Sequence, residues 1–205
     1  NRHPSRRVDI AVAPASDPNA GPDSTTLDYL VRESRPWTAF VQVSNTGTEQ
    51  TNEYRQRFGF AHHQLTGRDD TLRLDFVTAS FDDTYAGIAS YDAPLPGTTL
   101  ARARIFGSFS DYTASDIGLP GQDLSGTTVT YGGELIGTVY QRRSLFVDVF
   151  GGLMSKSYEV TNDLAGTEGD TDLLLGTAGV RLEDRRPARS FGAEVAIDWT
   201  FDGGD

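Results

Sequence analysis

The chain has 205 residues, with 22 Gly, no Cys, and 29 acidic residues against 18 basic ones, for a formal charge of -11. The lack of Cys excludes a disulfide framework, a Cys-ligated metal centre and a Cys nucleophile. The acidic balance disfavours binding of nucleic acid or anionic lipid through the overall field. No apolar run reaches the roughly 18 residues of a membrane-spanning helix, although spanning strands are shorter and only half apolar.

The first 34 residues form a unit of their own. We predict two strands, at 7–13 and 25–33, joined by a loop rich in Pro, Gly, Asp and Asn. Pro36 interrupts the pattern after them, and proline cannot donate to a strand ladder. A hairpin of this size cannot stand as a domain. We therefore divide the chain into 1–34, the end of one domain, and 35–205, a second unit.

A period of two residues dominates the second unit. From Phe191 to Phe201 every second residue is apolar, and the residues between them include Glu194 and Asp198. This alternation is typical of an extended strand with one apolar and one polar face, and no window shows a sustained period of 3.6. The pattern predicts an all-β, antiparallel fold. Nine strands are expected, near 37–46, 51–64, 71–81, 85–93, 98–112, 127–141, 144–159, 171–183 and 190–201.

The connections between these strands alternate in length. Those near 66–70, 94–98, 141–144 and 184–189 are tight, whereas 111–126 and 160–170 are longer. Consecutive hairpins place every second connection at the same end of a sheet, so one rim has short turns and the other has longer loops, as in outer-membrane barrels. Charge is divided between the two rims as well: the rim with short turns is rich in Arg, and the rim with longer loops is rich in Asp and Glu.

The alternative to a membrane barrel is a soluble β-sandwich, which also shows strands of period two. Several predicted strands of about 12 to 16 residues exceed the usual length in soluble sheets. Their polar faces carry both signs of charge, as a hydrated lumen would. The barrel hypothesis predicts that Val147, Val149, Val195 and Ile197 meet lipid. It also predicts ten lumen-lining residues, namely Arg55, Arg57, Arg73, Asp75, Glu134, Asp148, Arg181, Glu183, Glu194 and Asp198.

No motif predicts catalysis or a bound cofactor. His62 and His63 are adjacent on a strand, so their side chains point to opposite faces and cannot chelate one metal. Asp82-Asp83 and Asp170-x-Asp172 lack further calcium ligands at EF-hand spacing. The chain has no Gly-x-Ser-x-Gly elbow and no phosphate-binding Gly-Lys-Ser/Thr loop. We expect no enzyme activity, no metal, no cofactor and no nucleotide or nucleic-acid partner.

Several segments, in this order and spacing, resemble a known family. The segment 1–33 resembles the end of a POTRA domain, and 37–49 (WTAFVQVSNTGTE) the first barrel strand of two-partner secretion transporters. The segments 57–60 (RFGF), 65–70 (LTGRDD) and 91–98 (YDAPLPGT) resemble the second strand and two turns that follow. These are the type Vb outer-membrane transporters, the ShlB/FhaC/HecB-type hemolysin secretion/activation family of the BamA-related superfamily.

The resemblance implies the N-terminal portion of a transmembrane β-barrel, preceded by the last two strands of a POTRA domain. The family barrel has sixteen strands, so about nine strands imply a fragment; the lumen loop with its Val-Arg-Gly-Tyr/Phe motif has no counterpart here. The implied function is translocation of a secreted exoprotein of hemolysin or adhesin type across the bacterial outer membrane, with residues 1–34 in the periplasm and lipid around the barrel. A BamA/TamA-type insertase and a soluble β-sandwich binding module are the alternatives.

Overall fold

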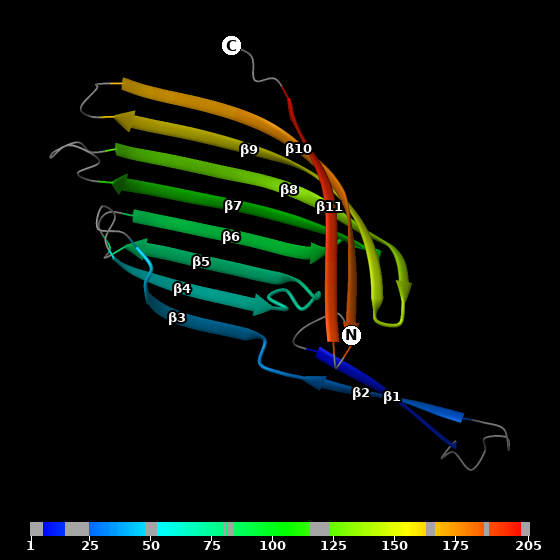
Figure 1. Cartoon of the computed structure of the whole chain (residues 1–205). Coiled ribbons are helices and arrows are strands. Elements are labelled where there is room, and N and C mark those ends of the chain that lie inside the picture. The colour runs from blue at the N-terminus through cyan, green and yellow to red at the C-terminus, as the bar shows by residue number, and fades with distance from the viewer. Residues whose placement is uncertain are drawn as a thin grey trace.

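The computed structural model describes residues 6–14, 25–47, 53–79, 81, 84–114, 124–162, 167–186 and 189–201. These residues form eleven strands in two separate antiparallel sheets (Figure 1). No helix long and apolar enough to cross a membrane is found among them. The all-β prediction is therefore confirmed.

The small sheet pairs β1 (Arg6–Pro14) with β2 (Thr25–Glu33), in a register that places Val8 opposite Val31. A short connection that contains Pro36 leads from β2 into the large sheet (Figure 1). The Pro36 carbonyl accepts a 2.6 Å hydrogen bond from the backbone N–H of His63, which fixes where the large sheet begins. That this hairpin is the end of a POTRA domain stays a prediction.

The large sheet contains nine strands in strict chain order, so each strand pairs with its neighbours in sequence. Figure 1 shows that the sheet curls into an open trough, with β3 and β11 at its two edges. The strands are β3 (Trp37–Asn45), β4 (Tyr54–His63), β5 (Thr71–Ala79), β6 (Thr84–Pro94), β7 (Ala101–Ala114), β8 (Leu124–Arg142), β9 (Leu145–Asn162), β10 (Thr167–Arg186) and β11 (Arg189–Phe201).

Three of these strands extend by three or more residues beyond an end that the sequence predicts. β9 runs to Asn162 and β10 begins at Thr167, so most of the loop predicted at 160–170 is strand. β8 likewise starts at Leu124 rather than 127. The prediction was wrong because little alternation survives there: one face is polar, with Glu159 opposite Asp170 and Thr161 opposite Glu168, and the other carries Val160 opposite Gly169.

The turn between β4 and β5 is organised by one carboxylate. Asp70 is fully buried and accepts hydrogen bonds from the Thr66 backbone N–H at 3.0 Å, the Thr66 hydroxyl at 2.8 Å and the Arg68 backbone N–H at 3.3 Å. Burial alone raises the pKa of Asp70, but these hydrogen bonds to the charged form outweigh it and lower the pKa below its usual value. Gly67 and Asp69 adopt φ of 74° and 59°, which closes the turn tightly.

β8 contains a bulge between Thr138 and Tyr140, where the register with β9 shifts by one residue. An extra residue in one strand reverses which side chains face which way beyond it. Gln141 therefore points to the same face as Thr138, and Tyr140 and Arg142 point to the other face. The sequence pattern gave no sign of this bulge.

Candidate functional site

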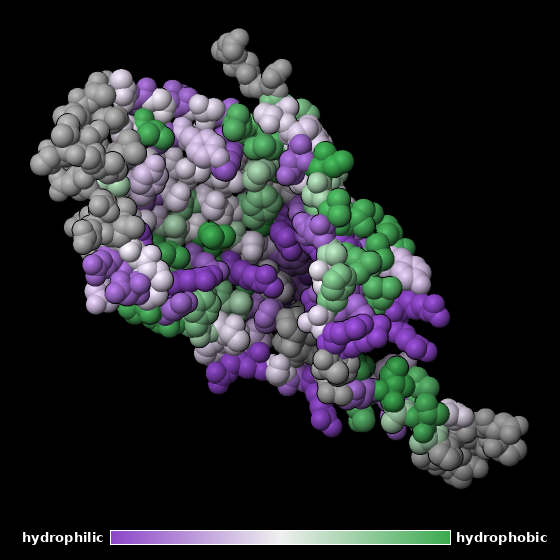
Figure 2. Space-filling view, viewed as in Figure 1, coloured by the Kyte–Doolittle hydropathy of each residue, from purple (hydrophilic) through white to green (hydrophobic). Residues whose placement is uncertain are grey.

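The register divides the side chains of the large sheet between a concave and a convex face, because directly opposed residues in antiparallel strands share a face. A polar cavity of about 1110 Å³ occupies the concave face and is lined from β5 to β11. Figure 2 shows hydrophilic side chains gathered in this hollow. The register places all ten sequence-predicted residues on the concave face: Arg55, Arg57, Arg73, Asp75, Glu134, Asp148, Arg181, Glu183, Glu194 and Asp198.

The first charged pair joins β4 to β5. Arg57 Nη2 lies 2.6 Å from Asp75 Oδ1, and Arg57 Nε donates to the same oxygen at 3.0 Å. The Arg57 guanidinium also lies 5.3 Å from the centroid of the Phe40 ring on β3. That ring covers Gly59, where no side chain competes for the space. The aromatic ring and the carboxylate together hold Arg57 against the wall.

A second charged cluster crosses β6, β7 and β8. Asp92 accepts from Arg102 Nε at 2.6 Å and forms an ion pair with Arg102 Nη2, while Arg104 lies 3.8 Å from the other Asp92 oxygen. Arg104 Nη1 is also 3.9 Å from Glu134 Oε1. Arg102 Nη2 donates to the Asp69 carbonyl at 2.9 Å, which ties this cluster to the turn after β4.

The third cluster lies on β8 to β11. Arg181 Nε donates to Glu194 Oε2 at 2.6 Å, and its guanidinium lies 5.0 Å from the centroid of the Phe150 ring. Asp148 is fully buried directly opposite Arg181 and accepts from the Thr138 hydroxyl at 2.7 Å. Nearer the turns, Arg185 Nε lies 2.6 Å from Glu183 Oε1.

The structure thus brings six of the ten predicted residues into ion pairs: Arg57, Asp75, Glu134, Arg181, Glu183 and Glu194. Asp148 lies opposite Arg181, while Arg55 is opposite Ser44, Arg73 opposite Ser90 and Asp198 opposite Thr177.

Sequence reasoning missed Asp92, Arg102 and Arg104, which make the densest charged cluster of the cavity. The signal for Arg102 and Arg104 was their spacing of two on a strand. The opposite face of this part of β7 carries alanines, and their small side chains give only a weak alternation of apolar and polar residues.

Opposite charges on the cavity wall occur in equal numbers. The described lining includes Arg73, Arg102, Arg104, Arg181 and Arg185 as cations, and Asp69, Asp92, Glu134, Glu183 and Glu194 as anions. Since most of these charges lie within 4 Å of an opposite one, the wall exerts little net field on whatever occupies the trough.

The described residues contain no group of three or more His, Asp or Glu side chains that could hold a metal ion. His63 Nδ1 lies 3.3 Å from the Thr71 hydroxyl on the concave face, and the adjacent His62 points to the convex face beside Phe60. Asp82 and Asp83 lie outside the described residues. Asp170 and Asp172 share the convex face with Glu159, at the loop end of the sheet.

The convex face is apolar and open. Val195 and Ile197 are 74% and 71% exposed, and Val147 and Val149 lie on the same face. By contrast, the buried hydrophobic side chains of the described chain are only Ala79, Ala114, Ile136, Phe146 and Phe150. A soluble sheet would bury its apolar face against a second layer, and among the described residues none covers this one.

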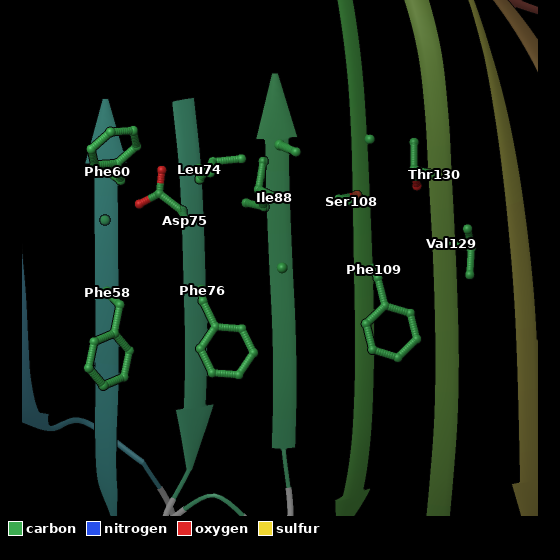
Figure 3. Close-up of a pocket in the computed structure, with 14 residues that line it drawn as sticks. Phe58, Phe60, Leu74, Asp75, Phe76, Ile88, Ser108, Phe109, Val129 and Thr130 are labelled. Carbon is green, nitrogen blue, oxygen red and sulfur yellow. The ribbon is translucent and has the colours of Figure 1, made fainter. Parts of the chain in front are cut away.

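Figure 3 shows an apolar groove of about 650 Å³ on the convex face. Phe58 and Phe76 line one side of it, and Phe109 and Val129 line the other. Gly87 and Gly107 are among the small residues between them. The groove adds apolar surface to the face that is already exposed. Its lining contains no pair of groups that could carry out chemistry.

Sequential antiparallel strands, a charged concave face and an apolar convex face define the wall of a β-barrel whose polarity is reversed relative to a soluble protein. Among solved structures, the chain is similar to CdiB from Escherichia coli, with a TM-score of 0.74 and 14% identity over 95% of this chain and 36% of that one. It is also similar to CdiB from Acinetobacter baumannii, with a TM-score of 0.71 and 13% identity over 96% of this chain and 38% of that one.

No family model and no curated protein matches the sequence. At such low identity the likeness establishes the fold. The chain spans little more than a third of either CdiB protein.

Proposed function

We propose that the chain is part of the barrel wall of an outer-membrane transporter that exports a partner protein by two-partner secretion. The observation that carries this proposal is the segregation of charge: of the ion pairs among the described residues, all but Arg186–Asp184 at the short-turn rim lie on the concave face, and large apolar side chains are exposed on the convex face. The fold likeness to CdiB and the resemblance of the segments 37–49 and 57–60 to this transporter family support it.

The concave wall suits passage of an unfolded chain. Ion-paired arginines and carboxylates hold water along the wall, so the backbone of a moving polypeptide stays hydrated. Because neighbouring charges cancel, cargo segments of either sign meet little net attraction or repulsion. No nucleotide is required; folding of the exported protein outside the cell supplies the driving force. The exported partner is an exoprotein of hemolysin or adhesin type.

The orientation follows from the chain path. β2 leads directly into Trp37 at the start of β3, which lies at the short-turn end of the sheet. If β1 and β2 close a periplasmic POTRA domain, the short turns with Gly67, Gly97 and Arg143 face the periplasm. The edge of β2 then lies at the entrance, where an extended partner segment adds as a further strand.

The test uses the full-length gene and its secreted partner in a strain that lacks the transporter. Expression should restore the partner to the culture medium and leave the assembly of unrelated porins unchanged. Loss of porin assembly on deletion, with export of the partner intact, would instead support the insertase alternative. Recovery of the full-length protein in the soluble fraction, without detergent, would contradict both functions and favour the soluble binding module.

A further inference from the structure

We propose that a cluster of arginines on the convex face, at the short-turn rim, binds the phosphate of an anionic phospholipid. This rim patch consists of Arg142 and Arg143 from the β8–β9 turn and of Arg186 and Arg189 beside the β10–β11 turn, all of them exposed. The inference rests on the proposed function, because it requires that the convex face meets a membrane.

The bulge in β8 gives the patch its direction. Beyond it, Arg142 is opposite Leu145, and that pair continues across the sheet to Asp184 and Phe191 on the convex face. If β8 alternated regularly through position 139, with no bulge, Arg142 would point into the trough. Arg186 and Arg189 are opposite each other on the same convex face. Three arginines from three strands thus lie on the convex face at the short-turn rim.

Positive charge on the rim patch exceeds what the protein neutralises. Asp184 is buried there, accepts from the Ser144 hydroxyl at 2.7 Å and lies 2.9 Å from Arg186 Nη2. Arg142, Arg143 and Arg189 make no ion pair with any residue that the structure describes. Arg186 and Arg189 are moreover direct cross-strand partners, and the one carboxylate of Asp184 attracts both, so two like charges share a single anion.

The two turns that carry the patch are fixed to each other. The backbone N–H of Arg185 donates to the Ser144 carbonyl at 3.0 Å, and the Ser144 hydroxyl bonds Asp184 across the same gap. The backbone segments that carry the arginines are therefore held next to each other. A site that is ordered in advance loses less entropy when it binds a ligand.

The chemistry of the surroundings selects a phospholipid over a soluble anion. Guanidinium groups bind phosphate in a bidentate manner. Directly above the arginines the same face carries Val147, Leu182 and Phe191, which suit an acyl chain, and Tyr140 at the level of the headgroup. The loop end of this face is acidic instead, with Asp111, Glu159, Asp170 and Asp172. The overall charge of -11 therefore does not oppose binding at the short-turn rim.

The experiment is native mass spectrometry of the full-length protein in neutral detergent, titrated with phosphatidylglycerol or with phosphatidylcholine. The wild type should bind phosphatidylglycerol about a hundredfold more tightly than phosphatidylcholine, since three arginines contribute roughly fivefold each. R142Q/R186Q/R189Q should lose this preference, roughly fivefold for each arginine removed. The matched control R55Q/R57Q/R73Q removes the same charge from the concave face and should keep the preference.

Heat-modifiable electrophoretic mobility shows whether each variant is folded, and R142Q alone, expected to lose about fivefold, replaces the triple variant if that one unfolds. Equal loss in the control, or no preference in the wild type, would overturn the inference. Displacement of phosphatidylglycerol by inorganic phosphate at equal concentration would overturn the lipid assignment and leave a simple anion site. If the triple variant still exports the partner but has lost its preference for phosphatidylglycerol, the proposed function remains intact. A full-length protein that is soluble without detergent would contradict both the proposed function and this inference.

Discussion

The ring of Phe150 on β9 lies over Gly179 on β10, with its Cζ 2.5 Å from where a Cβ of residue 179 would stand. The Val195 carbonyl approaches the same point from β11. Phe106 covers Gly132 in the same way, with Cζ 2.8 Å from the Cβ position. These rings pack along the concave wall because the opposing strand has no side chain there, which is how curved sheets are filled without a second layer.

Gly179→Ala is therefore expected to lower the free energy of unfolding of the full-length barrel by about 1–3 kcal/mol, because a backbone carbonyl and a held ring must both move. Gly87→Ala is the control, since nothing lies within 4 Å of its Cβ position. Urea titration in lipid vesicles measures both. An equal cost at the two positions would mean that the ring over Gly179 does not constrain the wall.

Val149→Arg tests which face meets lipid. The residue is the fifth of the 18 residues of β9, lies on the convex face and is 41% exposed. If that face contacts hydrocarbon, the substitution should destabilise the barrel by about 2–4 kcal/mol. Thr200→Arg, on the concave face of β11, should be tolerated much better because water is already there. Equal tolerance of the two variants in vesicles would show a sheet hydrated on both faces.

Asp70→Asn is expected to lower stability at pH 7 by about 1–3 kcal/mol, because an amide cannot accept all the hydrogen bonds that Thr66 and Arg68 donate. The folded-state pKa of Asp70 is lowered, so its contribution is complete above the unfolded value of about 4 and is lost as the pH falls through the folded value. The wild type and Asp70→Asn should therefore converge in stability in acid. A difference that stays constant from pH 7 to pH 3 would contradict a charged Asp70.

Arg102→Gln together with Arg104→Gln should make channels of the full-length protein more selective for cations. The change leaves Asp92 and Glu134 on the concave wall without their arginine partners. The measurement is the reversal potential of single channels in a planar bilayer under a salt gradient. Arg142→Gln removes a charge from the convex face and is the control. An unchanged reversal potential in the double variant would place this cluster away from the conducting path.

The strands and their faces were predictable because alternation survives wherever one side of a strand is apolar. Glu194 and Asp198 could be assigned to one face from the neighbouring Val195 and Ile197 alone. The ion pairs could not, since the pairing of Arg104 with Glu134 depends on a register between strands that no local pattern encodes. The loop-end extensions of β9 and β10 were also missed, because one of their faces is polar and the other carries Val160 as its one apolar side chain besides Gly169.

Val139 is the extra residue of β8, because Thr138 pairs with Asp148 and Tyr140 already pairs with the next residue, Val147. Deleting position 139 would make these two pairs consecutive, so Tyr140 and Arg142 would stay on the convex face and Gln141 on the concave face. A deletion in the regular part of β8, such as that of Gly133, would instead exchange the faces of all side chains on one side of it. Single-residue deletions should thus be tolerated better at position 139 than elsewhere in β8.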